Sequence, residues 1–360
     1  MRGSSRSGPG HQPSTVVRWT YAVAPRDYRR QRRRRVRLRD FFLLLALAVS
    51  IGLASGWLLN QWGSAPLETA SPAAPAEPTH HSLPAPDSRA ASSRPVPPAT
   101  PQPDSLEQIL TAHLPADNGT IAVYVLHTRT GHEVALNADR RMTAASLFKV
   151  PVMVEVFRQQ RQSRFTWEQT LVVGPQHWVP GTGILQASLG RRVSVRELVQ
   201  LMMSVSDNVA SVMLMDLVGR ENINETAKAL GLRDTLVHTY TARDPLGPDE
   251  DNTTSARDLG LLLRRMVAGE LIDRAASAAM IELMMQERVY DWMLRELPEG
   301  VRVAHKTGAL PNVRNDAGII FTPGGEVVLV VLMNDLRDQE QGEETIGTIA
   351  RLVFEYYQGR

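Results

Sequence analysis

Three short motifs in the chain contain residue types that can carry out acyl transfer. Ser146-Leu147-Phe148-Lys149 comes first, Ser206-Asp207-Asn208 second and Lys306-Thr307-Gly308 third. A serine hydroxyl becomes a useful nucleophile only when a neighbouring base takes its proton, and a lysine three residues further along a helix lies on the same face. The chain has three lysines, at positions 149, 228 and 306, and two of them lie in these motifs. The set therefore predicts an acyl-transfer site with Ser146 as the nucleophile.

Each motif also has an ordinary structural explanation. Ser146 and Lys149 could be surface residues of an amphipathic helix. Serine, aspartate and asparagine all favour turns and helix caps, and Lys306-Thr307-Gly308 could be a turn that ends a strand. Only the occurrence of all three motifs in this order favours a reaction class over these explanations.

The first two motifs supply groups that can move a proton. Lys149 can accept the proton of Ser146 if burial and the charge of Lys306 lower its pKa enough to populate the neutral amine. A helix that starts near Ser146 would direct backbone N–H groups towards the carbonyl under attack. Ser206 could pass a proton to the leaving amine, and Asn208 could hold a substrate amide or the Lys149 side chain.

The third motif supplies groups that can bind a substrate. Lys306 and Thr307 can anchor a carboxylate, and Gly308 permits close approach of a substrate backbone. The backbone N–H of Ala309 can complete an oxyanion hole. We expect His305 to be a packed strand residue rather than a catalytic base.

Other catalytic chemistries lack the residues that they need. The sequence contains no cysteine, which excludes disulfides, thiol catalysis and cysteine-based zinc sites. It also contains no Gly-x-Ser-x-Gly elbow, no His-Glu-x-x-His pair and no phosphate-binding loop. Side chains and water complete the expected chemistry, so we expect no metal and no organic cofactor.

Positive charge is concentrated at the N-terminus. Residues 1–103 hold 14 Lys/Arg and 5 Asp/Glu, which leaves 40 − 14 = 26 and 38 − 5 = 33 for the rest of the chain. Nine arginines lie between residues 26 and 39, directly before an uncharged run over 41–59. As a helix these 19 residues would rise about 28 Å, close to the roughly 30 Å of a bilayer core. Trp57 and Trp62 would lie at the outer interface, and the arginines would keep the N-terminus in the cytoplasm.

These patterns predict how the chain is organised before its folded part. We expect a basic cytoplasmic arm at 1–40 and a transmembrane signal-anchor helix at 41–62, although Gly63-Ser64-Ala65 could instead be a signal cleavage site. Residues 63–103 are rich in Pro, Ala, Ser and Thr without hydrophobic periodicity, which predicts a disordered linker. Membrane topology explains the arginines, so we expect no nucleic-acid partner. The folded domain would face outward from the cell membrane.

Residues 104–360 are enough for one sizeable core. Strand patterns occur at both ends of this region with helical patterns between them, which predicts an α+β fold. An antiparallel sheet built from both ends of the domain would be flanked by helices, beside an all-helical lobe. The expected strands are 121–126, 133–137, 301–306, 314–321 and 327–333. The expected helices are 104–114 with Asp104 as N-cap, one that starts near Ser146, 194–206, 209–218, 222–230, 254–266, 274–286 and 344–356.

With these residues in place, the domain resembles the serine β-lactamase and penicillin-binding protein superfamily and is most similar to class A β-lactamases. The intervals of 60 residues from Ser146 to Ser206 and 100 residues from Ser206 to Lys306 are similar to those of class A. Residues 201–210 resemble the family's helix before its Ser-Asp-Asn corner, and 305–318 resemble two of its strands. The resemblance extends over nearly the whole folded part.

The resemblance implies a β-lactamase/transpeptidase-like fold and a role for each matched residue. Ser146 would be acylated, Lys149 would be the general base or its helper, and Ser206 would relay the proton. The amides of Ser146 and Ala309 would form the oxyanion hole. The matched residues that would bind substrate are Asn208, Lys306, Thr307, Gly308 and Ala309.

One departure from class A concerns release of the acyl group. Class A enzymes use a loop glutamate in a Glu-x-x-Leu-Asn pattern, which should fall near residues 238–242, and this segment contains no glutamate. Asp244 is the nearest carboxylate. It could act as the base only if the loop brings it within reach of a water; otherwise it is a solvated loop acid.

Three functions remain open at this point. The first is a membrane-anchored class A-type hydrolase that opens β-lactams through a Ser146 acyl-enzyme. The second is a penicillin-binding D-alanyl-D-alanine carboxypeptidase or transpeptidase that acts on peptidoglycan, which the missing glutamate favours. The third is a sensor that binds a β-lactam or wall peptide without turnover. The expected partner is therefore a β-lactam or a D-alanyl peptide, and a monomer is assumed.

Overall fold

The computed structural model describes residues 105–238 and 251–358. A five-stranded antiparallel sheet with strand order β2-β1-β9-β8-β7 organises this part of the chain. Two of its strands come from the start of the domain and three from the end, which confirms the predicted sheet. The strands are β1 (Thr120–His127), β2 (Glu133–Leu136), β7 (Val303–Leu310), β8 (Val313–Thr322) and β9 (Gly325–Asn334).

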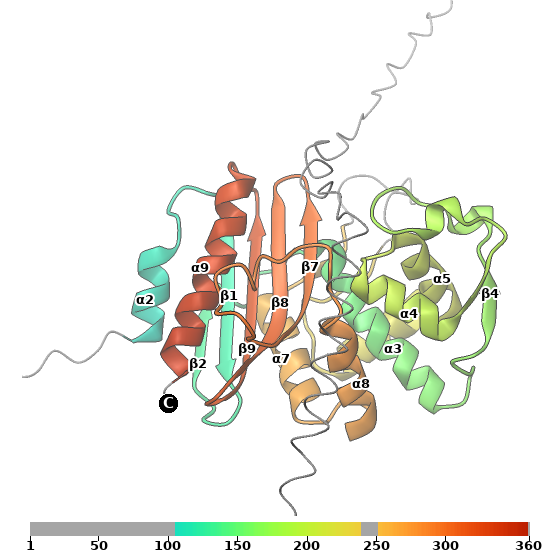
Figure 1. Ribbon diagram of the computed structural model, residues 1–360, viewed down its shortest axis with the longest axis horizontal. Coiled ribbons are helices and arrows are strands. Elements are labelled where there is room, and N and C mark those ends of the chain that lie inside the picture. Colours follow the sequence, from blue (N-terminus) through green and yellow to red (C-terminus); the bar gives the residue numbers. More distant parts are fainter. Residues whose placement is uncertain (1–104, 239–250, 359–360) are drawn as a thin grey trace, which may run out of the picture. The chain divides into compact units, whose positions relative to one another are not determined.

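Helices cover both faces of the sheet (Figure 1). On one face, α2 (Leu106–His113) and α9 (Gln339–Tyr357) pack against each other and over the strands. On the other face, α7 (Ala256–Val267) packs against β1, β8 and β9. Because successive strand residues point to opposite faces, Val123 belongs to the core under α9 and Tyr124 belongs to the core under α7.

The remaining helices form a lobe beyond the edge strand β7, as Figure 1 shows for α3, α4 and α5. The most deeply buried of them is α3, which packs against helices on several sides. The helices are α3 (Lys149–Arg161), α4 (Val195–Ser204), α5 (Asn208–Val218), α6 (Arg220–Ala229) and α8 (Arg274–Met284). Two short ladders complete the lobe: β3 (Met142–Thr143) with β6 (Thr253–Thr254), and β4 (Thr170–Val172) with β5 (Arg192–Ser194).

Several element boundaries differ from the predictions. The first helix begins after Ser105 rather than Asp104, because Ser105 Oγ accepts from the Gln108 N–H at 3.2 Å and the Gln108 side chain accepts from the Ser105 N–H at 2.8 Å. The helix predicted from residue 254 begins two residues later, because Thr254 still pairs with β3. The strand predicted over 301–306 continues to residue 310, because each of its residues to Leu310 pairs with β8.

The predicted arm, anchor helix and linker at 1–103 lie outside the described residues, as does Asp104. Within the described ranges, no helix is both long and apolar enough to cross a bilayer.

Candidate active site

Ser146 lies in a single 3-10 turn, Ala145–Phe148, that leads directly into α3. The sequence predicted a helix start here, and the structure adds the sharper turn. Ala145 has a φ of +47°, a left-handed conformation that is unusual for a residue other than glycine. The turn packs against β7 and β8, and the Asn315 side chain donates to the Ala144 carbonyl at 3.2 Å. Ser146 itself is half-buried on this fixed turn.

Lys149 is fully buried, and its amine lies at the Ser-Asp-Asn corner. Nζ contacts the Ser206 carbonyl at 2.7 Å, Ser206 Oγ at 2.9 Å and Asn208 Oδ1 at 2.8 Å. Burial lowers the pKa of Lys149 well below its usual value, and the nearby charge of Lys306 lowers it further. Within the described ranges no hydrogen bond joins Lys149 to the Ser146 hydroxyl. The arrangement holds a lysine that can be neutral, and its Ser206 contact survives either protonation state because a hydroxyl both donates and accepts.

The second motif forms the corner between α4 and α5, as predicted. Ser206 has a φ of +52°, and the Thr182 hydroxyl donates to its carbonyl at 2.7 Å. Asp207 holds the corner: Oδ1 accepts from the Ala210 N–H at 2.9 Å and Oδ2 from the Ile184 N–H at 2.6 Å. Asp207 therefore caps α5 and fixes the backbone that directs Ser206 towards Lys149.

Lys306 lies inside β7, where its amine contacts an acidic residue that sequence reasoning missed. Nζ donates to Glu287 Oε2 and, at 3.1 Å, to the Thr307 carbonyl. The Lys306 and Glu287 side chains are both completely buried. Glu287 follows α8 in an irregular segment and belongs to none of the three motifs, so nothing in the sequence separated it from surface acids.

Thr307, Gly308 and Ala309 continue β7 and do not form the strand-ending turn that was one explanation of the motif. The Thr307 hydroxyl is buried and has no hydrogen-bond partner within the described ranges. A Cβ added at Gly308 would lie 3.1 Å from the Ser146 nitrogen. Gly308 thus lets the nucleophile turn approach the strand, a role that the sequence did not predict. Ala309 is half-buried on the same strand.

His305 is a packed strand residue, as predicted. It is buried, and its Nδ1 pairs with Asp316 Oδ1 at 2.9 Å, while Asp316 Oδ2 accepts from the Met293 N–H at 3.1 Å. Burial by itself disfavours the charged imidazole, but the Asp316 carboxylate outweighs it and raises the pKa of His305. The pair ties β7 to β8 and to the segment before β7.

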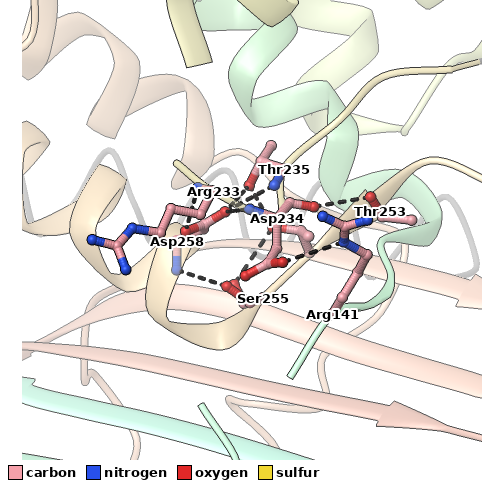
Figure 2. Close-up of polar contacts among 8 residues, drawn as sticks. Arg141, Arg233, Asp234, Thr235, Thr253, Ser255 and Asp258 are labelled. Atoms are coloured by element: carbon pink, nitrogen blue, oxygen red, sulfur yellow. Dashed lines mark hydrogen bonds and ion pairs between the residues drawn. The ribbon is translucent and has the colours of Figure 1, made fainter. Parts of the chain in front are cut away.

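A carboxylate on α7 organises the segment that leads to residue 238 (Figure 2). Asp258 Oδ1 accepts from the Arg233 N–H at 3.0 Å, and Oδ2 accepts from the Asp234 and Thr235 N–H groups at 2.7 and 2.8 Å. The Thr235 hydroxyl also donates to Oδ2, at 2.9 Å. One buried carboxylate therefore fixes three consecutive residues.

The two ends of the described chain that flank 239–250 are joined to each other. The His238 N–H donates to Asn252 Oδ1 at 2.8 Å, and the Arg220 side chain donates to the His238 carbonyl at 2.6 Å. Asp244, the proposed deacylating carboxylate, lies outside the described residues. The structure thus brings together the predicted site residues that lie within the described ranges.

The chain is similar to several known proteins. The model of the Beta-lactamase enzyme family matches residues 105–357. Beta-lactamase 1 of Streptomyces cacaoi is 27% identical over 252 residues, which cover 64% of this chain and 77% of that protein. The extended-spectrum β-lactamase PER-1 of Pseudomonas aeruginosa is 27% identical over 259 residues, which cover 66% and 82%.

Solved structures agree with these relatives. The β-lactamase of Sphaerobacter thermophilus matches with a TM-score of 0.66 and 29% identity, covering 71% of this chain and 97% of that one. PBP-A matches with a TM-score of 0.64 and 27% identity, covering 71% and 96%. The acyl-enzyme complex of a PBP-A mutant with penicillin G matches with a TM-score of 0.64 and 26% identity, covering 71% and 95%.

Proposed function

Because the chain belongs to the Beta-lactamase enzyme family and is a serine hydrolase that acts on amide bonds, we propose that it opens β-lactams through an acyl-enzyme on Ser146. The observation that carries this proposal is the environment of Lys149. The Lys149 amine is buried, has a lowered pKa and lies 2.9 Å from Ser206 Oγ. Lys149 also follows Ser146, the serine that needs a base, by three residues along the chain.

The proposed acylation step uses groups from all three motifs. The neutral Lys149 amine takes the Ser146 proton while Ser146 Oγ attacks the β-lactam carbonyl carbon. The backbone N–H groups of Ser146 and Ala309 stabilise the oxyanion. The carbon–nitrogen bond then breaks, Ser206 gives its proton to the ring nitrogen, and Lys149 returns a proton to Ser206. Ser146 is left esterified and the leaving nitrogen is protonated.

Substrate binding draws on β7 and on the Ser-Asp-Asn corner. The Thr307 hydroxyl, which has no partner among the described residues, and the Lys306 charge suit the carboxylate that β-lactams and peptide C-termini share. Asn208 lies beside Lys149, and its side-chain amide can accept a hydrogen bond from the substrate's acyl amide or donate one to it. These assignments give the substrate an orientation along β7, with its reactive carbonyl over Ser146.

Hydrolysis of the acyl-enzyme needs a base that activates water. Residues 238–242 contain no glutamate, and we propose Asp244 for this step. A carboxylate there could act through a water on the ester carbonyl. The rate of this step decides which substrate class the protein turns over.

A second candidate is a D-alanyl-D-alanine carboxypeptidase or transpeptidase. Two observations favour it: the similarity to PBP-A and the lack of glutamate at 238–242. The same Ser146 chemistry would release a terminal D-alanine, and a β-lactam would leave a stable adduct. We propose for either function that the helix at 41–62 anchors the protein in the cell membrane, with the N-terminus in the cytoplasm and the catalytic domain outside.

A turnover experiment separates the two candidates. The full chain is incubated with a chromogenic cephalosporin, and intact-protein mass is followed over the same period. Many turnovers with little lasting adduct support the β-lactamase. One equivalent consumed, a stable adduct and release of D-alanine from a wall peptide support the peptidoglycan enzyme. No reaction with either substrate contradicts both.

A further inference from the structure

An acidic side chain that lies outside the three motifs faces Lys306. Glu287 and Lys306 side chains both have an exposed fraction of 0%. Glu287 Oε2 accepts from Lys306 Nζ, and Oε1 accepts from the Val289 N–H at 2.9 Å. Both carboxylate oxygens therefore have a partner, and the backbone of the irregular segment after α8 fixes the orientation of the carboxylate.

Lys306 keeps a donor that no described residue uses. An ammonium has three N–H donors. Lys306 uses one for Glu287 and a second, at 3.1 Å, for the Thr307 carbonyl, which leaves the third. The next residue supplies the buried Thr307 hydroxyl, which also lacks a partner within the described ranges. Unused donors on two successive residues of β7 are suited to an anionic ligand.

We propose that Glu287 is a positioning residue for recognition of the substrate carboxylate, because it holds the Lys306 amine on β7 and keeps it charged. This inference rests on the proposed function, in which Lys306 and Thr307 bind that carboxylate. Glu287 itself would not touch the substrate.

The neighbours of Lys306 explain why a dedicated counter-charge is needed. Among the described residues, Lys149 and His305 are basic groups that interact electrostatically with it. The carboxylate of Asp316 is already paired with His305 at 2.9 Å, and its other oxygen accepts from a backbone N–H. A buried ammonium without a partner tends to lose its proton rather than remain charged.

The Asp207 carboxylate is also hydrogen-bonded to groups other than Lys306. Asp207 interacts with the Lys149 charge, but its oxygens accept from the backbone N–H groups of Ile184, Leu185 and Ala210. Glu287 is thus the carboxylate that contacts Lys306 directly. Its removal is expected to make carboxylate recognition depend on pH.

The test compares a penicillin with its methyl ester. Second-order acylation rates of the full chain are measured with both substrates between about pH 6 and about pH 8.5. The ratio of the two rates isolates carboxylate recognition, because titration of Lys149 affects both substrates equally. In the wild type the ratio should favour the acid and stay nearly constant. In Glu287→Gln it should fall about tenfold or more as the pH rises, because Lys306 loses its proton.

Three variants make the result specific. Glu287→Asp keeps the charge and should restore a nearly constant ratio. Glu287→Gln combined with Lys306→Arg should also give a constant ratio, because a guanidinium keeps its proton without a carboxylate. Glu282→Gln, which removes an exposed carboxylate on α8, is the matched control and should behave as the wild type.

The possible failures point to different claims. A Glu287→Gln ratio whose pH profile parallels that of the wild type would overturn the role of Glu287 and leave the proposed function standing. Equal loss with acid and ester would mean a structural role only, which also overturns it. A wild type that is acylated by acid and ester at equal rates would overturn carboxylate recognition by Lys306, and the Glu287 role with it, but would leave the Ser146 acyl-enzyme standing. A wild type that is acylated by neither substrate would overturn both proposals. If Glu287→Gln does not fold, Glu287→Met removes the same charge and carries the same expectation.

Discussion

At the scale of single residues, Lys149 makes the most direct prediction. Burial and the Lys306 charge lower its pKa, and the neutral amine is the proposed base. The acylation rate should therefore rise with pH through a pKa below the usual value of about 10.4. Lys306→Met removes the positive charge, so the pKa of Lys149 should rise and the rising limb should move to higher pH. The measurement is the rate against pH with a penicillin methyl ester.

The direction of that shift is the critical result. The ester is used because it has no carboxylate for Lys306 to bind. A limb that stays in place, or moves to lower pH, would show that Lys149 is not the group that titrates.

Gly308 makes a second prediction at this scale. An added Cβ would lie 3.0 Å from the Ala144 carbonyl and 3.1 Å from the Ser146 nitrogen, so Gly308→Ala should push the nucleophile turn away from β7. We expect acylation to slow at least about tenfold and unfolding free energy to fall by about 1–3 kcal/mol. Acylation kinetics and urea unfolding measure the two effects.

A matched variant separates stability from site geometry. Gly131 has a φ of +71° in a turn with open space around it, so Gly131→Ala should cost about 1 kcal/mol of stability through backbone strain. Its acylation rate should stay at the wild-type value. Equal slowing in both variants would contradict the proposed role of Gly308.

Residues within motifs could be identified from the sequence, whereas their supporting residues could not. Ser146, Lys149 and Ser206 carry a pattern of types and intervals that chance rarely produces. Glu287 lies 19 residues before Lys306 in an irregular segment, where an acid has no distinguishing neighbour or period. Only the three-dimensional fold shows that this carboxylate is buried against the lysine.

At the scale of elements, Asp258 connects α7 to the segment that precedes 239–250. Its carboxylate accepts from three consecutive backbone N–H groups and one hydroxyl, all within 3.0 Å. Asp258→Asn replaces an acceptor oxygen with an amide donor that faces donors. We expect the free energy of unfolding to fall by about 2–3 kcal/mol, measured by urea denaturation.

Asp234 provides the control for that variant. It pairs with Arg141 at 3.2 Å, and the Arg141 side chain is 60% exposed, so the ion pair is well solvated. Asp234→Asn should therefore cost less than about 1 kcal/mol. A loss in Asp258→Asn that is no larger than in Asp234→Asn would contradict the anchoring role of Asp258.

The boundary of a helix or strand could be predicted where a residue close to it in the sequence forms the cap. Ser194 at the start of α4 accepts from the Glu197 N–H at 3.2 Å, and the helix predicted over 194–206 begins at this residue. The predicted end of β7 at Lys306 was wrong, because the strand includes all of Lys306-Thr307-Gly308. Pairing with β8 carries the strand to Leu310, and such pairing between strands has no local signal. The two short ladders were missed for the same reason.

At the scale of the whole molecule, the sheet was predictable because its strand patterns occur at both ends of the domain with helices between them. The order β2-β1-β9-β8-β7 joins these ends directly through β1 and β9. The strand and helix patterns could not predict how closely the helical lobe packs against the sheet. That spacing depends on side-chain packing around the turn at Ser146.

The predicted anchor makes a prediction for the full chain. The uncharged run over 41–59 behind nine arginines should hold the protein in membranes through a carbonate wash. A chain that lacks residues 1–62 should fractionate as soluble protein and keep its acylation rate. Release of the full chain by carbonate, or protection of the catalytic domain from external protease in spheroplasts, would contradict the anchor or its orientation.

The measurement that tests the central claim most directly is penicillin labelling of the wild type and of Ser146→Ala. Intact mass followed by peptide mapping reports both the adduct and its position. We predict one penicilloyl group on Ser146 in the wild type and none in the variant, with folding of the variant checked by circular dichroism. An adduct that persists in a folded Ser146→Ala protein, or maps to another residue, would contradict the acyl-enzyme assigned to this serine.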